Sequence, residues 1–183
     1  MKIIKIDVDG VLRDLLVQMC NVYNEHYGES LNPDDVVHFD TEKIFTKCLE
    51  IDNIHPSEWL FQKNCFKLFY DSPVLYKAKE AMDMLHKKGF YIVIVTNQEY
   101  LHCKTNTLMW LDNNNIYYDS IIFTSKKDLI SGDIVVDDNI QNLDMCNEIR
   151  KVCIDAPFNL NKHNYEHYKN LYDFVKTLKK NNE

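Results

Sequence analysis

Short runs of apolar residues alternate along the chain with longer stretches in which apolar residues recur at helical spacing. Each short run is apolar along its length and rich in β-branched residues, which predicts strands buried on both faces. These predicted strands occupy residues 3–6, 90–95, 121–123, 134–136 and 151–154. The helical spacing predicts helices over residues 78–89, 99–113 and 165–179. This alternation predicts an α/β fold, with a parallel sheet covered by helices on both faces.

The segment after the first predicted strand is helical, where a return to a second strand would be the simplest continuation. Asp14 is suited to cap a helix, and two further helical stretches follow Pro33 and Pro56, since proline is favoured in a first helical turn. We therefore expect a helical insertion within a sheet-containing domain. The expected boundaries are residues 1–13 and 73–183 for the core, and residues 14–72 for an all-helical cap.

Composition limits the classes of protein to which the chain can belong. Its 183 residues, 45% of them apolar, suffice for one core with a small insertion. A net charge of −7 without a long basic run argues against a stable nucleic-acid complex. No segment approaches the roughly 18 to 20 apolar residues of a membrane span, and the N-terminus opens into a strand, so we expect a cytoplasmic protein without a membrane partner. The six cysteines lack metal-binding spacing, which indicates reduced, mostly buried thiols.

Polar side chains follow the predicted strands at their carboxyl ends. Because these ends meet at one edge of a parallel sheet, we expect the side chains to lie close together. Carboxylates suit a hard cation, while a lysine and a hydroxyl suit an anion, and phosphoryl transfer requires both kinds of group. A glycine beside the first carboxylates would let backbone approach a ligand closely. The polar set comprises Asp7, Asp9, Thr96, Asn97, Lys127, Asp137 and Asp138.

The order of these groups resembles the four motifs of the haloacid dehalogenase superfamily of phosphatases. The motifs are Asp7-x-Asp9-Gly10, the strand ending in Thr96-Asn97, Lys127, and the pair Asp137-Asp138. The D-x-D-G-V-L form of the first motif and the segments 72–74, 124–127 and 155–159 are most similar to the 5'(3')-deoxyribonucleotidases. The resemblance implies a Rossmann-like core with a small helical cap. It also implies a phosphomonoesterase of nucleotide metabolism that hydrolyses (deoxy)ribonucleoside monophosphates to nucleoside and phosphate.

The same resemblance implies the roles of the acidic residues. Asp7 would be the catalytic nucleophile that forms an aspartyl-phosphate, while Asp9 would protonate the leaving nucleoside oxygen and then activate water. The implied cofactor is Mg²⁺, held by the Asp7 side chain, the Asp9 backbone carbonyl and the pair Asp137-Asp138. Which aspartate of that pair binds the metal directly stays open here, the other being linked to it indirectly.

The phosphate group of the substrate would be bound by a second set of residues, again by resemblance. The Thr96 hydroxyl and the Asn97 backbone amide would donate to it, and Lys127 would steady both the phosphate and the ionised Asp7. Lys127 is preferred to Lys126 on spacing alone. The full phosphate-binding set is Asp9, Gly10, Thr96, Asn97 and Lys127.

Two local features depart from the family pattern or admit another role. Arg13 stands where a small residue is expected, and Asn97-Gln98 replaces a Ser-Pro pair, so the preferred leaving group is undecided. Asp138 is alternatively the N-cap of a helix that begins near Ile140.

Several functional alternatives also remain. The same mechanism would suit sugar phosphates or the 3'-phosphate of a nucleic-acid end, and a non-catalytic phosphate-binding module is a further alternative that the presence of Asp7 and Asp9 disfavours. Tyr23 and Tyr27 are candidates for contact with the nucleoside, although packing is the more common role of such rings. An apolar stripe on the cap or on the tail helix would support a homodimer.

Overall fold

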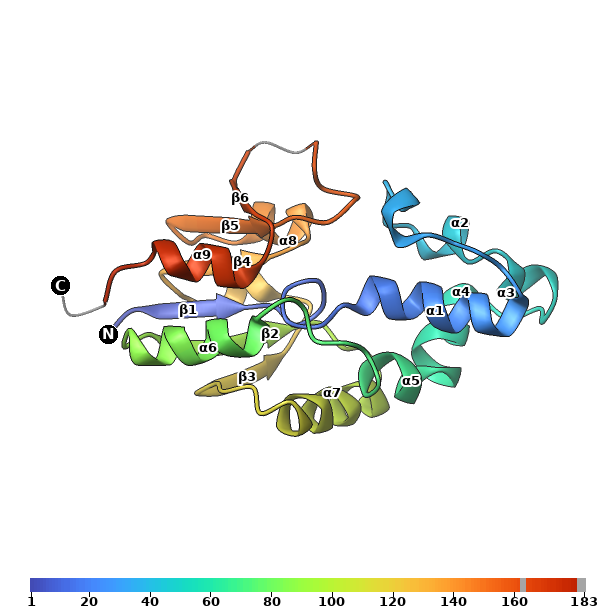
Figure 1. The fold of residues 1–183 in the computed structure, drawn as a ribbon, viewed down its shortest axis with the longest axis horizontal. Coiled ribbons are helices and arrows are strands. Elements are labelled where there is room, and N and C mark those ends of the chain that lie inside the picture. The colour runs from blue at the N-terminus through green and yellow to red at the C-terminus, as the bar shows by residue number, and fades with distance from the viewer. Residues whose placement is uncertain (162–163, 181–183) are drawn as a thin grey trace.

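The computed structural model describes residues 1–161 and 164–180, and its centre is a six-stranded sheet in the order β3-β2-β1-β4-β5-β6 (Figure 1). Every neighbouring pair of strands is parallel. The parallel α/β architecture predicted from the sequence is therefore confirmed. The strands are β1 (Ile3–Ile6), β2 (Tyr91–Thr96), β3 (Ser120–Phe123), β4 (Ile134–Asp137), β5 (Arg150–Ile154) and β6 (Glu166–Tyr168).

Helices cover both faces of the sheet, because successive strand residues point to opposite faces. On one face, Ile4 and Ile6 of β1 pack in a buried cluster with α6 and α9, which lie side by side. On the opposite face, Val135 of β4 packs against α8. The helices of this part of the chain are α6 (Ala78–Lys87), α7 (Leu101–Asn113), α8 (Ile140–Met145) and α9 (Leu171–Thr177).

The C-terminal segment differs from the continuous helix predicted over residues 165–179. Its first part forms β6, which pairs with β5 at the edge of the sheet, and α9 begins only after Asn170. The Asn170 side chain accepts a hydrogen bond from the backbone N–H of Asp173 and so caps the helix. Apolar spacing continues across this boundary, so spacing alone joins two elements that strand pairing and capping separate.

Residues 14–72, all of which the structure describes, form helices and turns beyond the carboxyl ends of the strands (Figure 1). The single helical stretch expected after Pro33 is wrong. Asp40 accepts a hydrogen bond from the backbone N–H of Glu42 and begins a new helix there, which divides the stretch. The elements are α1 (Leu15–Tyr27), η1 (Pro33–Asp35), α2 (Thr41–Ile44), α3 (Lys47–Glu50), α4 (Pro56–Glu58), η2 (Trp59–Lys63) and α5 (Cys65–Phe69).

This helical segment has a buried cluster of its own, separate from the cluster beneath α6 and α9. Side chains from α1, η2 and α5, such as Met19 and Trp59, form most of it. Cys103 of α7 completes the cluster, with its Sγ 3.4 Å from Sγ of Cys65, so α5 packs against α7. The cysteines are all free and buried, as the sequence predicted.

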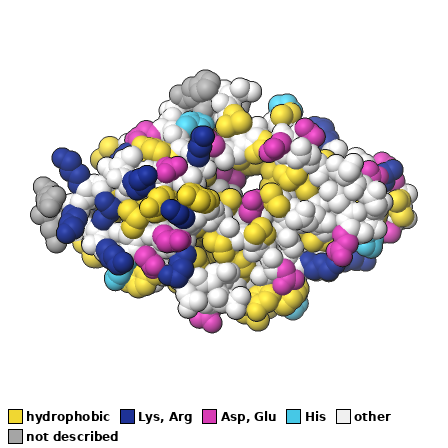
Figure 2. All heavy atoms as spheres, viewed as in Figure 1, with side chains coloured by type: hydrophobic (Ala, Val, Ile, Leu, Met, Phe, Trp, Pro, Cys, Tyr) yellow, Lys and Arg dark blue, Asp and Glu magenta, His cyan; other side chains and the backbone are white. Residues whose placement is uncertain are grey.

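The surface in the view of Figure 2 mixes basic and acidic side chains over the core. It is hollowed where the core meets the helical segment, and acidic side chains lie at the edge of the hollow (Figure 2). None of the helices in the described part of the chain has the length and apolar character that crossing a membrane requires. The hollow lies at the end of the molecule's central strands, where ligands of α/β proteins collect.

Candidate active site

The carboxyl ends of the central strands bring the predicted acidic groups to one edge of the sheet. β1 lies between β2 and β4, with Ile6 in register with Val136. Asp7 directly follows β1, and its backbone N–H donates to the carbonyl of Val136 at 3.0 Å. Carboxylate oxygens of Asp7, Asp137 and Asp138 all lie within 4.8 Å of one another. The structure therefore gathers three of the residues predicted to meet here.

Lys127 places its ammonium group between two of these carboxylates. It opens η3 (Lys127–Leu129), and its Nζ lies 3.0 Å from Asp7 Oδ1 and 2.7 Å from Asp137 Oδ2. Burial acts to lower the pKa of Lys127, but the two carboxylates outweigh burial and raise that pKa above its ordinary value. Lys127 is therefore a fixed cation. Lys126 is exposed, so the geometry agrees with the preference for Lys127.

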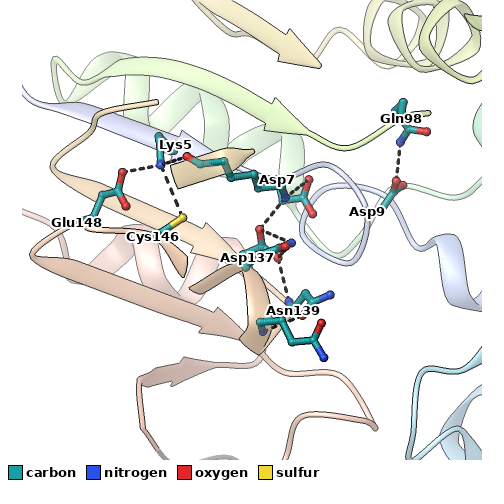
Figure 3. Close-up of polar contacts among 11 residues, drawn as sticks. Lys5, Asp7, Asp9, Gln98, Asp137, Asn139, Cys146 and Glu148 are labelled. Atoms are coloured by element: carbon teal, nitrogen blue, oxygen red, sulfur yellow. Dashed lines mark hydrogen bonds and ion pairs between the residues drawn. The ribbon is translucent and has the colours of Figure 1, made fainter. Parts of the chain in front are cut away.

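A second buried lysine, Lys5, holds the loop that carries Lys127. Figure 3 shows Lys5 beside Glu148 and Cys146. Lys5 Nζ donates to the backbone carbonyls of Lys127 at 2.9 Å and Ile130 at 2.7 Å. It also pairs with Glu148 Oε1 at 2.5 Å, which balances its buried charge. The only sequence signal of this contact is a charged residue inside an otherwise apolar strand.

The remaining charge at this edge is negative. Burial raises the pKa of Asp7 to about 7, with Lys127 opposing the shift and Asp137 and Asp9 adding to it. Burial, together with the charges of Asp137 and Asp7, raises the pKa of Asp138 well above its ordinary value. Asp7 Oδ1 is buried, and its ion pair with Lys127 lacks the geometry of a hydrogen bond. One lysine does not neutralise three carboxylates, and oxygen ligands of this kind suit Mg²⁺, so these residues fit a divalent cation.

The two aspartates of the acidic pair differ in how much of their carboxylate is free. Asp137 accepts hydrogen bonds from Lys127 Nζ, from the backbone N–H of Asn139 at 2.9 Å, and from Asn142 Nδ2 at 3.0 and 3.2 Å. The Asp138 carboxylate accepts no hydrogen bond from the described residues. Asp138 is therefore the better candidate for a direct metal ligand, and Asp137 the better candidate for orienting Lys127.

Asp138 is positioned by packing against Gly10 and by a hydrogen bond to its backbone carbonyl. A Cβ atom added to Gly10 would lie 1.9 Å from Asp138 Oδ2, so only glycine leaves room for this carboxylate. Asn159 Nδ2 donates to the Asp138 carbonyl at 2.7 Å. The alternative role of Asp138 as a helix cap is wrong, because Asn139 caps α8 by accepting from the backbone N–H of Gln141 at 2.9 Å.

The residues assigned to phosphate binding lie at the same edge with different exposures. Thr96 ends β2 and is buried, whereas Asn97 is exposed. The Gly10 N–H donates to the Arg13 carbonyl at 2.9 Å, so Gly10 offers space to the site and its amide is already occupied. The phosphate contacts of these residues stay predictions.

The Asp9 carboxylate is turned away from Asp7 and toward Gln98 (Figure 3). Gln98 Nε2 donates to Asp9 Oδ2 at 2.8 Å, and Arg13 Nε donates to Asp9 Oδ1 at 2.7 Å. Sequence reasoning found Arg13 and Gln98 only as departures from a family pattern and missed that both contact Asp9. An arginine four residues after an aspartate was the available signal.

Tyr23 and Tyr27, the candidates for contact with a nucleoside, pack within the helical segment. Tyr23 is buried, with the rings of Phe45 and Trp59 at 5.2 and 6.2 Å. Tyr27 donates its hydroxyl to Asp52 at 2.5 Å. Packing is thus the role that the structure gives these two tyrosines.

Comparison with known proteins identifies the family. The family described as 5' nucleotidase, deoxy (pyrimidine), cytosolic type C matches residues 1–180. The chain belongs to this family. It is 25% identical over 179 residues to the 5'(3')-deoxyribonucleotidase of Bacillus subtilis, covering 97% of this chain and 98% of that protein. It is 28% identical over 172 residues to the 5'(3')-deoxyribonucleotidase of Clostridium acetobutylicum, covering 92% and 89%.

Solved structures agree on the fold. A haloacid dehalogenase-like hydrolase from Burkholderia xenovorans aligns with a TM-score of 0.61 at 13% identity, covering 96% of this chain and 95% of that one. A magnesium-bound hydrolase of the same superfamily from Bacillus subtilis aligns with a TM-score of 0.62 at 12% identity, covering 96% and 97%. The predicted deoxyribonucleotidase family and the enzyme class, a phosphoric monoester hydrolase, are confirmed.

Proposed function

We propose that the protein is a Mg²⁺-dependent phosphatase that hydrolyses (deoxy)ribonucleoside monophosphates through an aspartyl-phosphate on Asp7. The observation that carries this proposal is the buried group of Asp7, Lys127, Asp137 and Asp138 at the carboxyl edge of the sheet. This group combines a nucleophile, a fixed cation and free carboxylate oxygens, which are the parts that phosphoryl transfer needs. Family membership and the deoxyribonucleotidase relatives support the substrate class.

The first half-reaction uses both aspartates of the first motif. An Asp7 carboxylate oxygen attacks phosphorus while the bond from phosphorus to the nucleoside oxygen breaks, and Asp9 gives that oxygen its proton. Lys127, Thr96 and the Asn97 backbone amide hold the phosphate oxygens. Lys127 also stabilises ionised Asp7 before the attack, because its Nζ lies 3.0 Å from Oδ1.

The second half-reaction regenerates the enzyme. Asp9 takes a proton from water, the water oxygen attacks phosphorus, and the bond from phosphorus to Asp7 breaks to release phosphate. When bound by Asp7, Asp138 and the Asp9 carbonyl, with Asp137 behind them, Mg²⁺ would offset the repulsion between the carboxylate nucleophile and the anionic ester. Two observations support this ligand set: the buried Asp7 Oδ1 accepts no aligned hydrogen bond, and the Asp138 carboxylate beside it forms no ion pair among the described residues.

We also propose residues 14–72 as a cap over a core made of residues 1–13 and 73–183. The separate buried cluster of the helical segment supports the division. Phe39 of this segment contacts Phe158 of the core, with 5.4 Å between ring centroids. Phe158 lies next to Asn159, whose side chain donates to the Asp138 carbonyl. A cytoplasmic location rests on the family's description as cytosolic. The homodimer and the absence of a nucleic-acid complex stay predictions.

The nucleophile is tested by Asp7→Asn. With thymidine 5'-monophosphate and Mg²⁺, phosphate release should fall on the order of 10⁴-fold or more, because the amide is no nucleophile. Asp112→Asn on the exposed surface of α7 is the matched control and should behave as wild type. Circular dichroism should show both variants folded. Turnover by Asp7→Asn at the wild-type rate would eliminate the mechanism.

The substrate class is tested by a panel of phosphate esters at equal concentration. Nucleoside 5'- and 3'-monophosphates, in ribose and deoxyribose forms, are compared with sugar phosphates and with an oligonucleotide that carries a 3'-phosphate. The highest kcat/KM is expected for a deoxyribonucleoside monophosphate. A preference for the sugar phosphates or for the oligonucleotide would replace the proposed substrate while leaving the mechanism in place.

A further inference from the structure

Both oxygens of the Asp9 carboxylate are held by side chains that the reaction described above does not use. Oδ1 accepts a hydrogen bond from Arg13 Nε at 2.7 Å and also lies 2.7 Å from Arg13 Nη2. Oδ2 accepts a hydrogen bond from Gln98 Nε2 at 2.8 Å. Arg13 on one oxygen and Gln98 on the other therefore fix the direction that the Asp9 carboxylate has in Figure 3.

Arg13 is a rigid anchor for Oδ1. Its side chain has no exposed surface, and its Nη1 and Nη2 also donate to the Phe69 carbonyl at 2.7 Å and the Thr107 hydroxyl at 3.1 Å. The guanidinium lies 4.9 Å from the centre of the Phe69 ring and 5.2 Å from that of Trp110. A buried cation needs a counter-charge, and Asp9 is the carboxylate that an ion pair joins to Arg13 within the described part of the chain.

Gln98 is a different kind of partner for Oδ2. It is buried in the loop that follows Thr96, which brings it beside the residues proposed to hold the phosphate. It offers a single neutral N–H, whereas Arg13 offers two nitrogens of a charged group. Arg13 holds the carboxylate with two contacts and needs it as the counter-charge of a buried cation, whereas Gln98 loses only one hydrogen bond on release. Oδ2 is thus the oxygen that can exchange its partner at the smaller cost.

We propose that Arg13 and Gln98 are positioning residues that fix the direction of the Asp9 carboxylate. Arg13 anchors Oδ1, and Gln98 holds Oδ2 until the leaving oxygen of the ester takes its place. Before the transfer, Asp9 takes up a proton from water on Oδ2. In the transfer, the bond from Oδ2 to hydrogen breaks, the proton goes to the nucleoside oxygen, and that oxygen keeps the electron pair of its bond to phosphorus. Asp9 is then again the carboxylate that balances the charge of Arg13. The inference rests on the proposed function, since it requires Asp9 to serve a leaving group.

A positioning role predicts a loss that depends on the leaving group. A nucleoside oxygen needs a proton as it leaves, so a misdirected Asp9 slows the hydrolysis of a nucleotide. The nitrophenolate of 4-nitrophenyl phosphate is a stable anion that leaves without a proton, so its release does not depend on the direction of Asp9. Damage to the fold, to the metal site or to phosphate binding would lower kcat/KM for both esters alike.

Gln98→Met is the principal variant, because methionine has a similar volume and cannot donate a hydrogen bond. Its kcat/KM for thymidine 5'-monophosphate should fall by about 10-fold or more, with kcat/KM for 4-nitrophenyl phosphate within about 2-fold of wild type. The comparison uses kcat/KM because it reports the first half-reaction alone, whereas Asp9 also serves as the base of the second half-reaction, which both esters share. Arg13→Lys should show the same selective loss if circular dichroism shows it folded. Glu99→Gln, on the exposed neighbour of Gln98, is the control and should match wild type on both esters.

The outcomes separate this inference from the proposed function. If Gln98→Met lowers kcat/KM equally for both esters, or for neither, the positioning role is overturned, while hydrolysis of the nucleotide by the wild-type protein still supports the proposed function. If wild-type protein hydrolyses neither ester with Mg²⁺, the proposed function fails and this inference fails with it. If Arg13→Lys does not fold, the result for Gln98→Met decides alone.

Discussion

Replacing Gly10 by alanine is expected to weaken Mg²⁺ binding as well as the fold. Gly10 has φ 74°, where an L residue costs about 1 to 2 kcal/mol relative to glycine. The added Cβ would also lie 1.9 Å from Asp138 Oδ2, whereas ordinary contact begins near 3.4 Å. The Asp138 carboxylate or the Gly10 loop must therefore give way by about 1.5 Å, which moves a proposed metal ligand.

Gly28→Ala is the matched control, because Gly28 has φ 68° and nothing lies within 4 Å of its added Cβ. Urea denaturation in chelator should show a loss of at least about 1 to 2 kcal/mol in the free energy of unfolding for both variants. Isothermal titration calorimetry should show a loss of about 10- to 100-fold in Mg²⁺ affinity for Gly10→Ala alone. Wild-type Mg²⁺ affinity in Gly10→Ala would refute the assignment of Asp138 as a metal ligand packed against Gly10.

Two further predictions concern charge and capping. The free energy of unfolding of the metal-free protein, measured in urea, should rise as the pH falls from about 8 to about 6. Over this range Asp7 takes up a proton in the folded protein, where burial raises its pKa to about 7. The same carboxyl in the unfolded chain has a pKa near 3.8 and does not take up a proton there, so protonation favours the folded state. The gain should shrink in saturating Mg²⁺ and in Asp7→Asn, and an undiminished gain in Asp7→Asn would assign it to other groups. Asn139→Ala should lower the free energy of unfolding by about 1 kcal/mol, because it removes the cap of α8. Asn113→Ala at the exposed end of α7 should change it by less than about 0.5 kcal/mol, and equal losses in the two variants would contradict the capping role.

The convergence of the acidic groups could be predicted because it follows from topology. Asp7 and Asp137 end neighbouring parallel strands, so their positions in the sequence fix the edge at which they meet. Lys127 could be predicted only by resemblance. Its contact with the carboxylates depends on the position of η3 and on Lys5, which holds the Lys127 carbonyl. The choice between Asp137 and Asp138 needed the hydrogen bonds themselves, since adjacent aspartates are equivalent in a sequence.

Contacts between segments far apart in the chain escaped the sequence. Gln98 reaches Asp9 across 89 positions, and no periodicity records such a pair. The missed strand β6 has a similar cause, because its pairing with β5 replaces the helix that local apolar spacing indicated. Capping by Asp40 likewise overrode the helical pattern after Pro33.

The packing of α5 against α7 limits how this protein could be divided into fragments or recombined with other proteins. Cys103 and Tyr100, both outside residues 14–72, pack in the buried cluster of that segment. A shortened chain that joined residue 13 directly to residue 73 would present them to water, and an excised 14–72 fragment would lack one side of its interior. Grafting this insertion onto another phosphatase scaffold would therefore require transplanting the facing surface of α7 as well.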